Sequence, residues 1–312
     1  MISLRYHVIS IAAVFLALAL GVVLGSTAIS GRLLSGLNSN RDELGRQVTD
    51  LQAQNNVLHA RLSDADVFGA AVGPRTVAGI LRGRTVVLVT TADADPADRD
   101  ALTGLIKNAG AIVTGELQLT DAFTDPSRSD QLSELTTRLL PAGLRLPTAP
   151  DAGTLAGGLL GSLLLINPQN GTVQTTPAET TAVVAGLSDG GFVRTGPQVR
   201  PAQLAVVLTG GVSHGDGSGD RSGVLARFAT QLDRSGAGAV LAGRPGSAEG
   251  NGPIGVVRAD TAATSALSTV DDVSTAAGRV VTVLALAEQA EGRAGRYGTG
   301  GNAQAVVPAI QG

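Results

Sequence analysis

The N-terminal part of the chain carries two hydrophobic patterns in succession, first a continuous apolar run and then a seven-residue repeat. The run covers residues 8–29 and contains no ionisable side chain. At about 1.5 Å per helical residue, its roughly 22 residues can cross the roughly 30 Å hydrocarbon core of a bilayer. Residues 8–30 are therefore predicted to form a transmembrane anchor. Because Arg5 and His7 precede it, residues 1–7 are expected to be a cytosolic stub and the main domain to be extracytoplasmic.

A cleaved signal peptide is the alternative interpretation of the same run. Ser26 and Ala28 are small residues at the spacing that a signal peptidase accepts. The apolar core of a signal peptide usually has only about 7–15 residues, so the greater length of this run favours the anchor. Gly21 and Gly25 also form a small-residue face on which two membrane helices can approach closely.

Leucine recurs at every seventh position after the apolar run. Leu37, Leu44, Leu51 and Leu58 occupy heptad position d, and Arg41, Val48, Asn55 and Leu62 occupy position a. Leu at d with a single Asn at a is typical of a parallel two-stranded coiled coil, because the Asn can hydrogen-bond its own symmetry mate. Residues 34–68 are therefore predicted to form a coiled-coil stalk that joins two copies as a parallel homodimer. The residues expected at this interface are Leu37, Leu44, Val48, Leu51, Asn55, Leu58 and Leu62.

Two residues weaken this prediction. Arg41 is a poor core residue at position a, and Gly45 costs about 1 kcal/mol relative to Ala inside a helix. The alternative is an amphipathic helix that packs on its own domain. The neighbouring anchor, which would align two chains in parallel, favours the dimer.

Short apolar runs alternate with helical patterns over residues 75–291. Strands are predicted at residues 85–91, 111–117, 204–209 and 239–242. Helices are predicted at 96–110, 155–166, 221–234 and 275–290, and a further helix is expected to start at Ser127 or Ser129 and to be stopped by Pro141. Continuous apolar strands between helices are typical of a mostly parallel sheet that is covered on both faces. The predicted fold is therefore an α/β domain, Rossmann-like, with right-handed crossovers. Residues 292–312 contain several glycines and are expected to form a flexible tail.

Composition excludes several classes of function. The net charge of −3 and the 2% aromatic content give no basic surface or stacking platform for nucleic acid. The chain has no cysteine, so the domain has no disulfides. Asp93 and Asp95 are interpreted as a helix-capping turn, and Asp271 and Asp272 are expected to face solvent. With no catalytic constellation in the sequence, no enzyme activity is predicted.

The loop from Gly210 to Gly223 is the best candidate for a ligand site, because it follows a strand at the end where parallel sheets bind ligands. Its glycines match neither the dinucleotide-binding nor the Walker pattern. Asp216, Ser218 and Asp220 are spaced like the first ligands of a calcium loop, but Arg221 and Arg227 replace the turn glycine and the bidentate glutamate. His214, Asp216 and Asp220 are therefore only weak candidates for a metal site. The alternative is a mobile surface loop.

Three segments carry a resemblance to a known family: the opening block MISLRYHVISIAAVFLALALGVVLGS, the leucine stalk, and TGGVS…GDGSG from Thr209 onward. In them the chain resembles the mycobacterial copper transport protein B (MctB) family of actinobacterial envelope proteins. The resemblance implies a role in copper efflux or homeostasis at the envelope, with an outer-membrane pore proposed for the family. It also implies an alternative, since corynebacterial relatives are implicated in daughter-cell separation through a partner that acts on cell-wall hydrolysis. For this chain that would mean a dimeric, non-catalytic scaffold with another envelope or divisome protein.

A function that involves copper is implied only by this resemblance. Cu(I) prefers thiolate and thioether ligands, and the chain has no Cys and a single Met, Met1. The residues themselves therefore predict no resident cofactor.

Overall fold

The computed structural model describes residues 4–196, 199–212 and 215–309, with side chains described for residues 5–25 and from Asn40 onward. The chain divides into two compact units, Met1–Ala65 and Asp66–Gly312. The second unit begins before residue 75, where the sequence predicts the domain to start.

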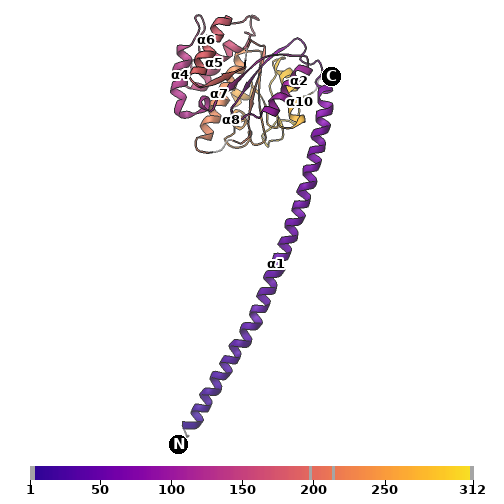
Figure 1. Ribbon diagram of the computed structural model, residues 1–312, viewed down its shortest axis with the longest axis vertical. Helices are drawn as coiled ribbons and strands as arrows, with labels where there is room; N and C mark the ends of the chain where they lie inside the picture. Colours follow the sequence, from indigo (N-terminus) through magenta and orange to yellow (C-terminus); the bar gives the residue numbers. More distant parts are fainter. Residues whose placement is uncertain (1–3, 197–198, 213–214, 310–312) are drawn as a thin grey trace. The chain divides into compact units, whose positions relative to one another are not determined.

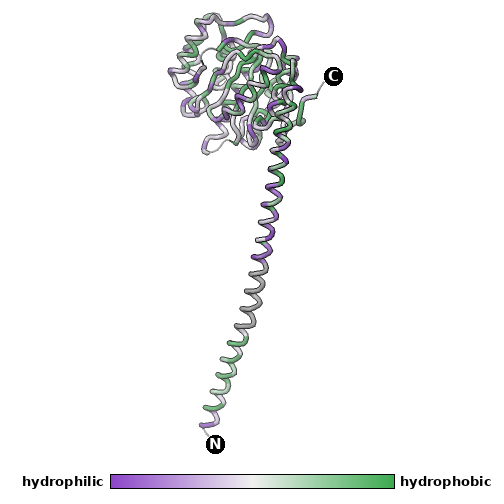
Figure 2. The backbone as a smooth tube through the Cα atoms, turned by 45° about the vertical axis from the view of Figure 1, so that its right-hand side comes forward, coloured by the Kyte–Doolittle hydropathy of each residue, from purple (hydrophilic) through white to green (hydrophobic). Residues whose placement is uncertain are grey.

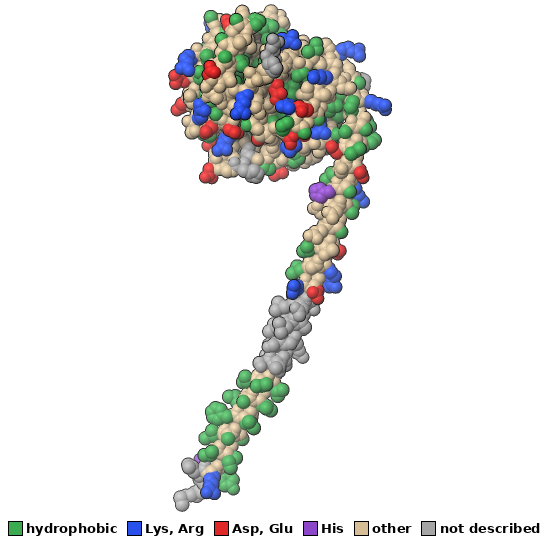
Figure 3. Space-filling model, in the orientation of Figure 1, with side chains coloured by type: hydrophobic (Ala, Val, Ile, Leu, Met, Phe, Trp, Pro, Cys, Tyr) green, Lys and Arg blue, Asp and Glu red, His purple; other side chains and the backbone are tan. Residues whose placement is uncertain are grey.

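The first unit consists of helix α1 (Leu4–Thr76), whose last residues belong to the second unit. One stretch of the described chain, Arg5–Gly25, is long and apolar enough to cross a membrane. Figure 2 shows the hydrophobic character of this end of α1, and Figure 3 shows its exposed apolar side chains. The predicted apolar helix is therefore present.

The heptad residues of the predicted stalk lie on α1 and are exposed in the single chain. Those with described side chains are Leu44, Val48, Leu51, Asn55, Leu58 and Leu62, and the leucines among them are between 57% and 67% exposed. A helix of 3.6 residues per turn places such a series on one face. The side chain of Leu37 lies outside the described residues. The helical conformation is confirmed, and the pairing of two stalks stays a prediction.

The second unit is built on a sheet with helices on both sides of it (Figure 1). Among the described residues the sheet has seven strands, in the order β3-β2-β1-β4-β5-β6-β7. The strands are β1 (Thr85–Thr90), β2 (Ile112–Leu119), β3 (Val193–Thr195), β4 (Leu204–Thr209), β5 (Ala239–Gly243), β6 (Ser268–Val270) and β7 (Arg296–Tyr297). All pair in parallel except β3, which is antiparallel to β2 at the edge. The predicted mostly parallel sheet is confirmed.

Helices cover both faces of the sheet because successive strand residues point to opposite sides. Val87 and Val89 pack in the core beneath α5 (Ala152–Leu164) and α7 (Ser218–Ser235). Val86 and Leu88 pack beneath α2 (Pro96–Asn108) and α10 (Ala276–Gln289). The other helical segments are α3 (Asp121–Thr124), α4 (Ser129–Arg138), α6 (Pro177–Asp189), α8 (Pro253–Ala259), α9 (Thr261–Thr264) and a 3-10 turn (Pro126–Arg128).

Local signals in the sequence located several of these elements. The Asp95 side chain accepts a hydrogen bond from the Ala97 amide and caps α2, as predicted. The apolar segment predicted as a buried helix at 155–166 is α5, which is buried over most of its length. The edge strand β3 and helices α6 and α8 are not among the predicted elements.

The prediction of a flexible tail after residue 292 is wrong for its first part. Arg296–Tyr297 forms β7 beside β6, and Tyr297 is buried. The guanidinium of Arg258 holds this segment by donating to the Tyr297 carbonyl at 2.8 Å and to the Asp271 carboxylate at 2.6 Å. Asp271 in turn accepts from the Thr299 amide at 2.8 Å. The expectation that Asp271 and Asp272 face solvent is therefore wrong, because Asp271 is buried in an ion pair and Asp272 is only 7% exposed.

The end of α1 packs on α10 within the second unit. The Asp66 carboxylate accepts a hydrogen bond from the Ala276 amide at the start of α10 and lies 4.0 Å from the Arg279 guanidinium. A Cβ at Gly73 would collide with the Val280 side chain, and a Cβ at Gly69 would lie in a tight contact, 3.2 Å from the Cβ of Ala276. The last turns of α1 therefore pack on the domain of the same chain, as in the alternative to the coiled coil. The stalk leucines with described side chains are exposed.

Candidate functional site

A crevice opens at the carboxyl ends of β1, β2 and β4, with a cavity of about 260 Å³. The strand order reverses between β1 and β4, because β2 pairs with one side of β1 and β4 with the other. Open α/β sheets bind ligands at such switch points, outside the carboxyl ends of the strands. The predicted loop after β4 borders this crevice through Val212 and Ser218.

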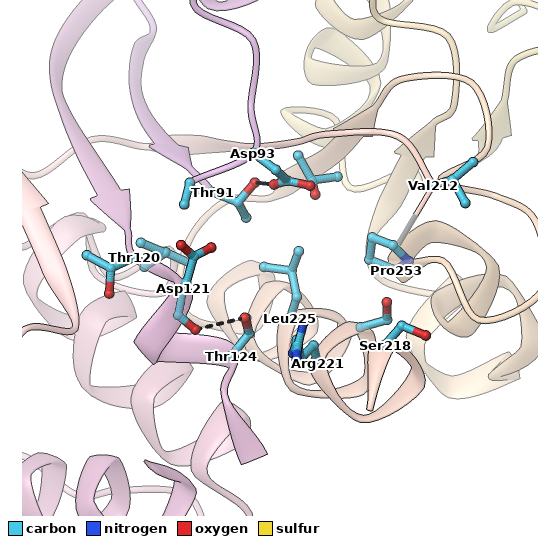
Figure 4. A pocket seen from close by; sticks show the side chains of 14 residues that line it. Thr91, Asp93, Thr120, Asp121, Thr124, Val212, Ser218, Arg221, Leu225 and Pro253 are labelled. Atoms are coloured by element: carbon cyan, nitrogen blue, oxygen red, sulfur yellow. Dashed lines mark hydrogen bonds between the residues drawn. The ribbon is translucent and has the colours of Figure 1, made fainter. Parts of the chain in front are cut away.

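Residues distant in the sequence line the crevice together because each follows its own strand. Thr91 and Asp93 follow β1, Asp121 follows β2, and Ser218 and Arg221 begin α7 after β4. Figure 4 shows these side chains arranged around one common space.

One wall of the crevice is acidic. The Thr91 hydroxyl donates a hydrogen bond to the Asp93 carboxylate, and Gly210 lies so close to that carboxylate that a Cβ would collide with it. A glycine is therefore required at position 210 for close approach of the two loops. Asp121 lies beside this wall at the start of α3, and the Thr124 hydroxyl donates to its backbone carbonyl at 3.4 Å.

The opposite wall is the first turn of α7. Its N-cap is Gly217, which has a φ of 73° and offers no side chain to cap the helix. The Arg221 guanidinium donates to the Asp216 carbonyl at 3.4 Å, and among the described residues no carboxylate lies within ion-pair distance of it. Its charge contributes to lowering the pKa of Asp125, after the larger effect of the hydrogen bonds from Ser127. The positive end of α7 and Arg221 make this wall attractive to anions.

A chain of ion pairs supports the crevice from the side of β5. The Arg244 guanidinium lies 2.6 Å from both Asp95 and Asp98, and Arg279 lies 3.3 Å from Asp98. The hydrogen bond to Asp98 raises the pKa of Arg244. The Arg244 amide also donates to the Gly210 carbonyl at 3.1 Å, so the ion pairs fix the loop that borders Asp93.

The predicted metal candidates do not assemble into a site. His214 lies outside the described residues, and Asp216 and Asp220 are exposed and do not line the cavity. In the described part of the chain, no three His, Cys, Asp or Glu side chains come together to hold a metal ion. The sequence thus located the loop, but the lining residues Asp93 and Asp121 were missed. Their position directly after two buried strands was the available signal.

Comparison with known proteins identifies relatives along almost the whole chain. The family described as "Copper transport outer membrane protein, MctB" matches residues 1–308. The protein named copper transporter MctB is 41% identical over 312 residues in both Mycobacterium tuberculosis and Mycobacterium bovis, covering 98% of this chain and 99% of each relative. The Mycobacterium leprae protein of the same name is 38% identical over 315 residues, with the same coverage.

Proposed function

Since the chain belongs to the MctB family of copper transport outer membrane proteins, we propose that it acts in copper transport at the cell envelope. The observation that carries the proposal is the identity of 38–41% to copper transporters over 98% of the chain. The alignment with these relatives covers the predicted anchor, the predicted stalk and the α/β domain. The names of these relatives give no support to the alternative role in daughter-cell separation.

The proposed location is the membrane, with the α/β domain outside the cytosol. The apolar stretch Arg5–Gly25 supports a single membrane span. Arg5 and His7 at its start favour a cytosolic N-terminus by the positive-inside rule. We expect the span to be retained in the mature protein because of its length.

The stalk is proposed to join two copies in parallel. Its support is the exposed face that carries Leu44, Leu51 and Leu58, because a helix with such an apolar stripe gains stability when a second helix covers it. Asn55 lies in the same stripe and would set the register of the pair.

The domain is proposed to be a Rossmann-like, non-catalytic part of the protein. Support for the fold comes from the central order β2-β1-β4-β5-β6 with helices on both faces. The family is one of transport proteins, which favours a role without chemical conversion of a substrate.

The donor set does not fit a tight Cu(I) site within one chain. Thiolate and thioether ligands are absent except for Met1, and the three histidines His7, His59 and His214 belong to different segments. A single apolar helix cannot enclose a hydrophilic route through the bilayer, since such a route needs several elements around it. We therefore propose that copper is cargo of an assembly that contains this chain.

Copper content of whole cells tests the function. Deletion of the gene in its host should raise cell-associated copper under copper load, measured by plasma mass spectrometry, and plasmid-borne wild type should restore the normal level. A variant that begins at Asn38 and lacks the anchor should fail to restore it. Unchanged copper in the deletion strain would contradict the proposal.

Copper titration of the full chain in detergent tests the donor-set argument separately. Weak binding or none is expected for Cu(I) and Cu(II). Tight stoichiometric binding would show that this chain itself holds the cargo.

A further inference from the structure

We propose that the crevice between β1, β2, β4 and α7 binds a small zwitterion, a molecule with an anionic group at one end and an ammonium group at the other. This site is independent of copper transport. It rests on charges of opposite sign that border one cavity without pairing with each other.

The anionic group would lie at the first turn of α7. This helix has 18 residues, and no side chain caps its N-terminus at Gly217. Arg221 lines the cavity and has no carboxylate within 4.0 Å among the residues that the structure describes. The helix dipole and the guanidinium both favour an anion at this position.

A threonine hydroxyl adds an independent observation. Thr209 ends β4, lines the cavity and is only 3% exposed. Within the described part of the chain no hydrogen bond involves its hydroxyl. The hydroxyl is not among the described buried polar atoms that lack a partner, so it is open to the cavity, where a ligand can form a hydrogen bond with it.

The ammonium group would lie at the acidic wall. Asp93 and Asp121 line the cavity, and within the described residues neither carboxylate forms an ion pair with Arg or Lys. Asp93 is held in place by the Thr91 hydroxyl and by contact with Gly210. Two unpaired carboxylates favour a cation between them, and a primary ammonium has three donors to share.

The separation of the two walls explains why one ligand would carry both charges. Arg221 reaches neither Asp93 nor Asp121 within ion-pair distance, although all three border the same space (Figure 4). A zwitterion would bridge this gap with one charge at each wall. The cavity of about 260 Å³ is slightly below the usual range for drug-sized ligands, about 300–1,000 Å³, so the ligand would be the size of an amino acid.

Isothermal titration of the full chain in nanodiscs tests the proposal. The probes are O-phosphoethanolamine and L-alanine, which carry both charges, and inorganic phosphate, acetate and ethanolamine, which carry one. We expect one or both zwitterions to bind at least ten-fold more tightly than each singly charged probe. O-phosphoethanolamine and L-alanine distinguish a phosphate-bearing ligand from a carboxylate-bearing one. Failure of both zwitterions to bind at 10 mM, or equally tight binding of phosphate alone, would overturn the proposal.

Variants locate the binding. Arg221→Gln and Asp121→Asn should each lower the affinity for the zwitterion at least ten-fold. The matched controls Arg194→Gln and Asp130→Asn remove exposed charges that do not line the cavity and should leave the affinity unchanged. Thermal melting confirms that each variant is folded. Unchanged affinity in folded Arg221→Gln and Asp121→Asn, or loss of affinity in the controls, would also overturn the proposal.

Discussion

Helix α5 carries a glycine at every fourth position where it packs on α7, and Gly157→Ala tests whether this close approach stabilises the domain. Gly153, Gly157 and Gly161 lie on one face of α5. A Cβ added to Gly157 would lie 2.8 Å from the Phe228 carbonyl oxygen and 2.8 Å from the Cβ of Gln231. Both distances are too short for van der Waals contact, so the helices must separate.

Two opposing contributions decide the magnitude. Alanine is favoured over glycine in a helix by about 1 kcal/mol. Overpacking of a close interface costs about 1–3 kcal/mol. Because one contact is a backbone carbonyl, which cannot rotate away, we expect the steric cost to dominate. Gly157→Ala should lower the free energy of unfolding by up to about 2 kcal/mol.

The control is Gly104→Ala in α2, where nothing lies within 4 Å of the added Cβ. This variant should gain about 0.5–1 kcal/mol from helix propensity alone. Urea denaturation of the full chain, followed by circular dichroism, measures both changes as shifts of the midpoint at constant slope. The reasoning is refuted if Gly157→Ala is as stable as Gly104→Ala.

Four further outcomes are expected. Arg258→Met leaves Asp271 buried without its partner and should lower the free energy of unfolding, measured by urea denaturation, by about 3–5 kcal/mol. The double variant Arg258→Met with Asp271→Leu should lose less stability. Equal losses in the two variants would contradict a stabilising role of the ion pair. Burial raises the pKa of Asp233 to about 6, so its charged form destabilises the fold increasingly as the pH rises from about 4 to 6. Asp233→Asn should therefore be more stable than wild type at pH 7, by up to about 3 kcal/mol, and should lose this advantage near pH 4. Leu51→Ala should dissociate the proposed stalk dimer in sedimentation, and a wild-type monomer at tens of micromolar would rule the dimer out. Mass spectrometry of the membrane-extracted protein should detect the N-terminal peptide, and a mature chain that starts near residue 29 would show cleavage.

The sequence by itself determined the elements whose signals are local. The uncharged run at 8–29, the heptad leucines and the Asp95 cap each occupy a few turns or less, so neighbouring residues are sufficient to recognise them. The four predicted strands correspond to β1, β2, β4 and β5, because a parallel sheet covered on both faces requires continuous apolar runs. The ligand loop was located for the same reason, since it directly follows one of these runs.

Only the tertiary structure decided which distant residues meet. The segment that contains β7 is held in place by Arg258 and Asp271, which form a buried ion pair. Neither residue belongs to that segment. Asp93, Asp121 and Arg221 share one crevice because the strand order brings three loops together. The spacing of residues along the chain does not show such contacts. The periodic pattern of apolar residues can be recognised within a short segment, whereas the pairing of distant charges and the close packing of helices depend on how the whole sheet places its strands.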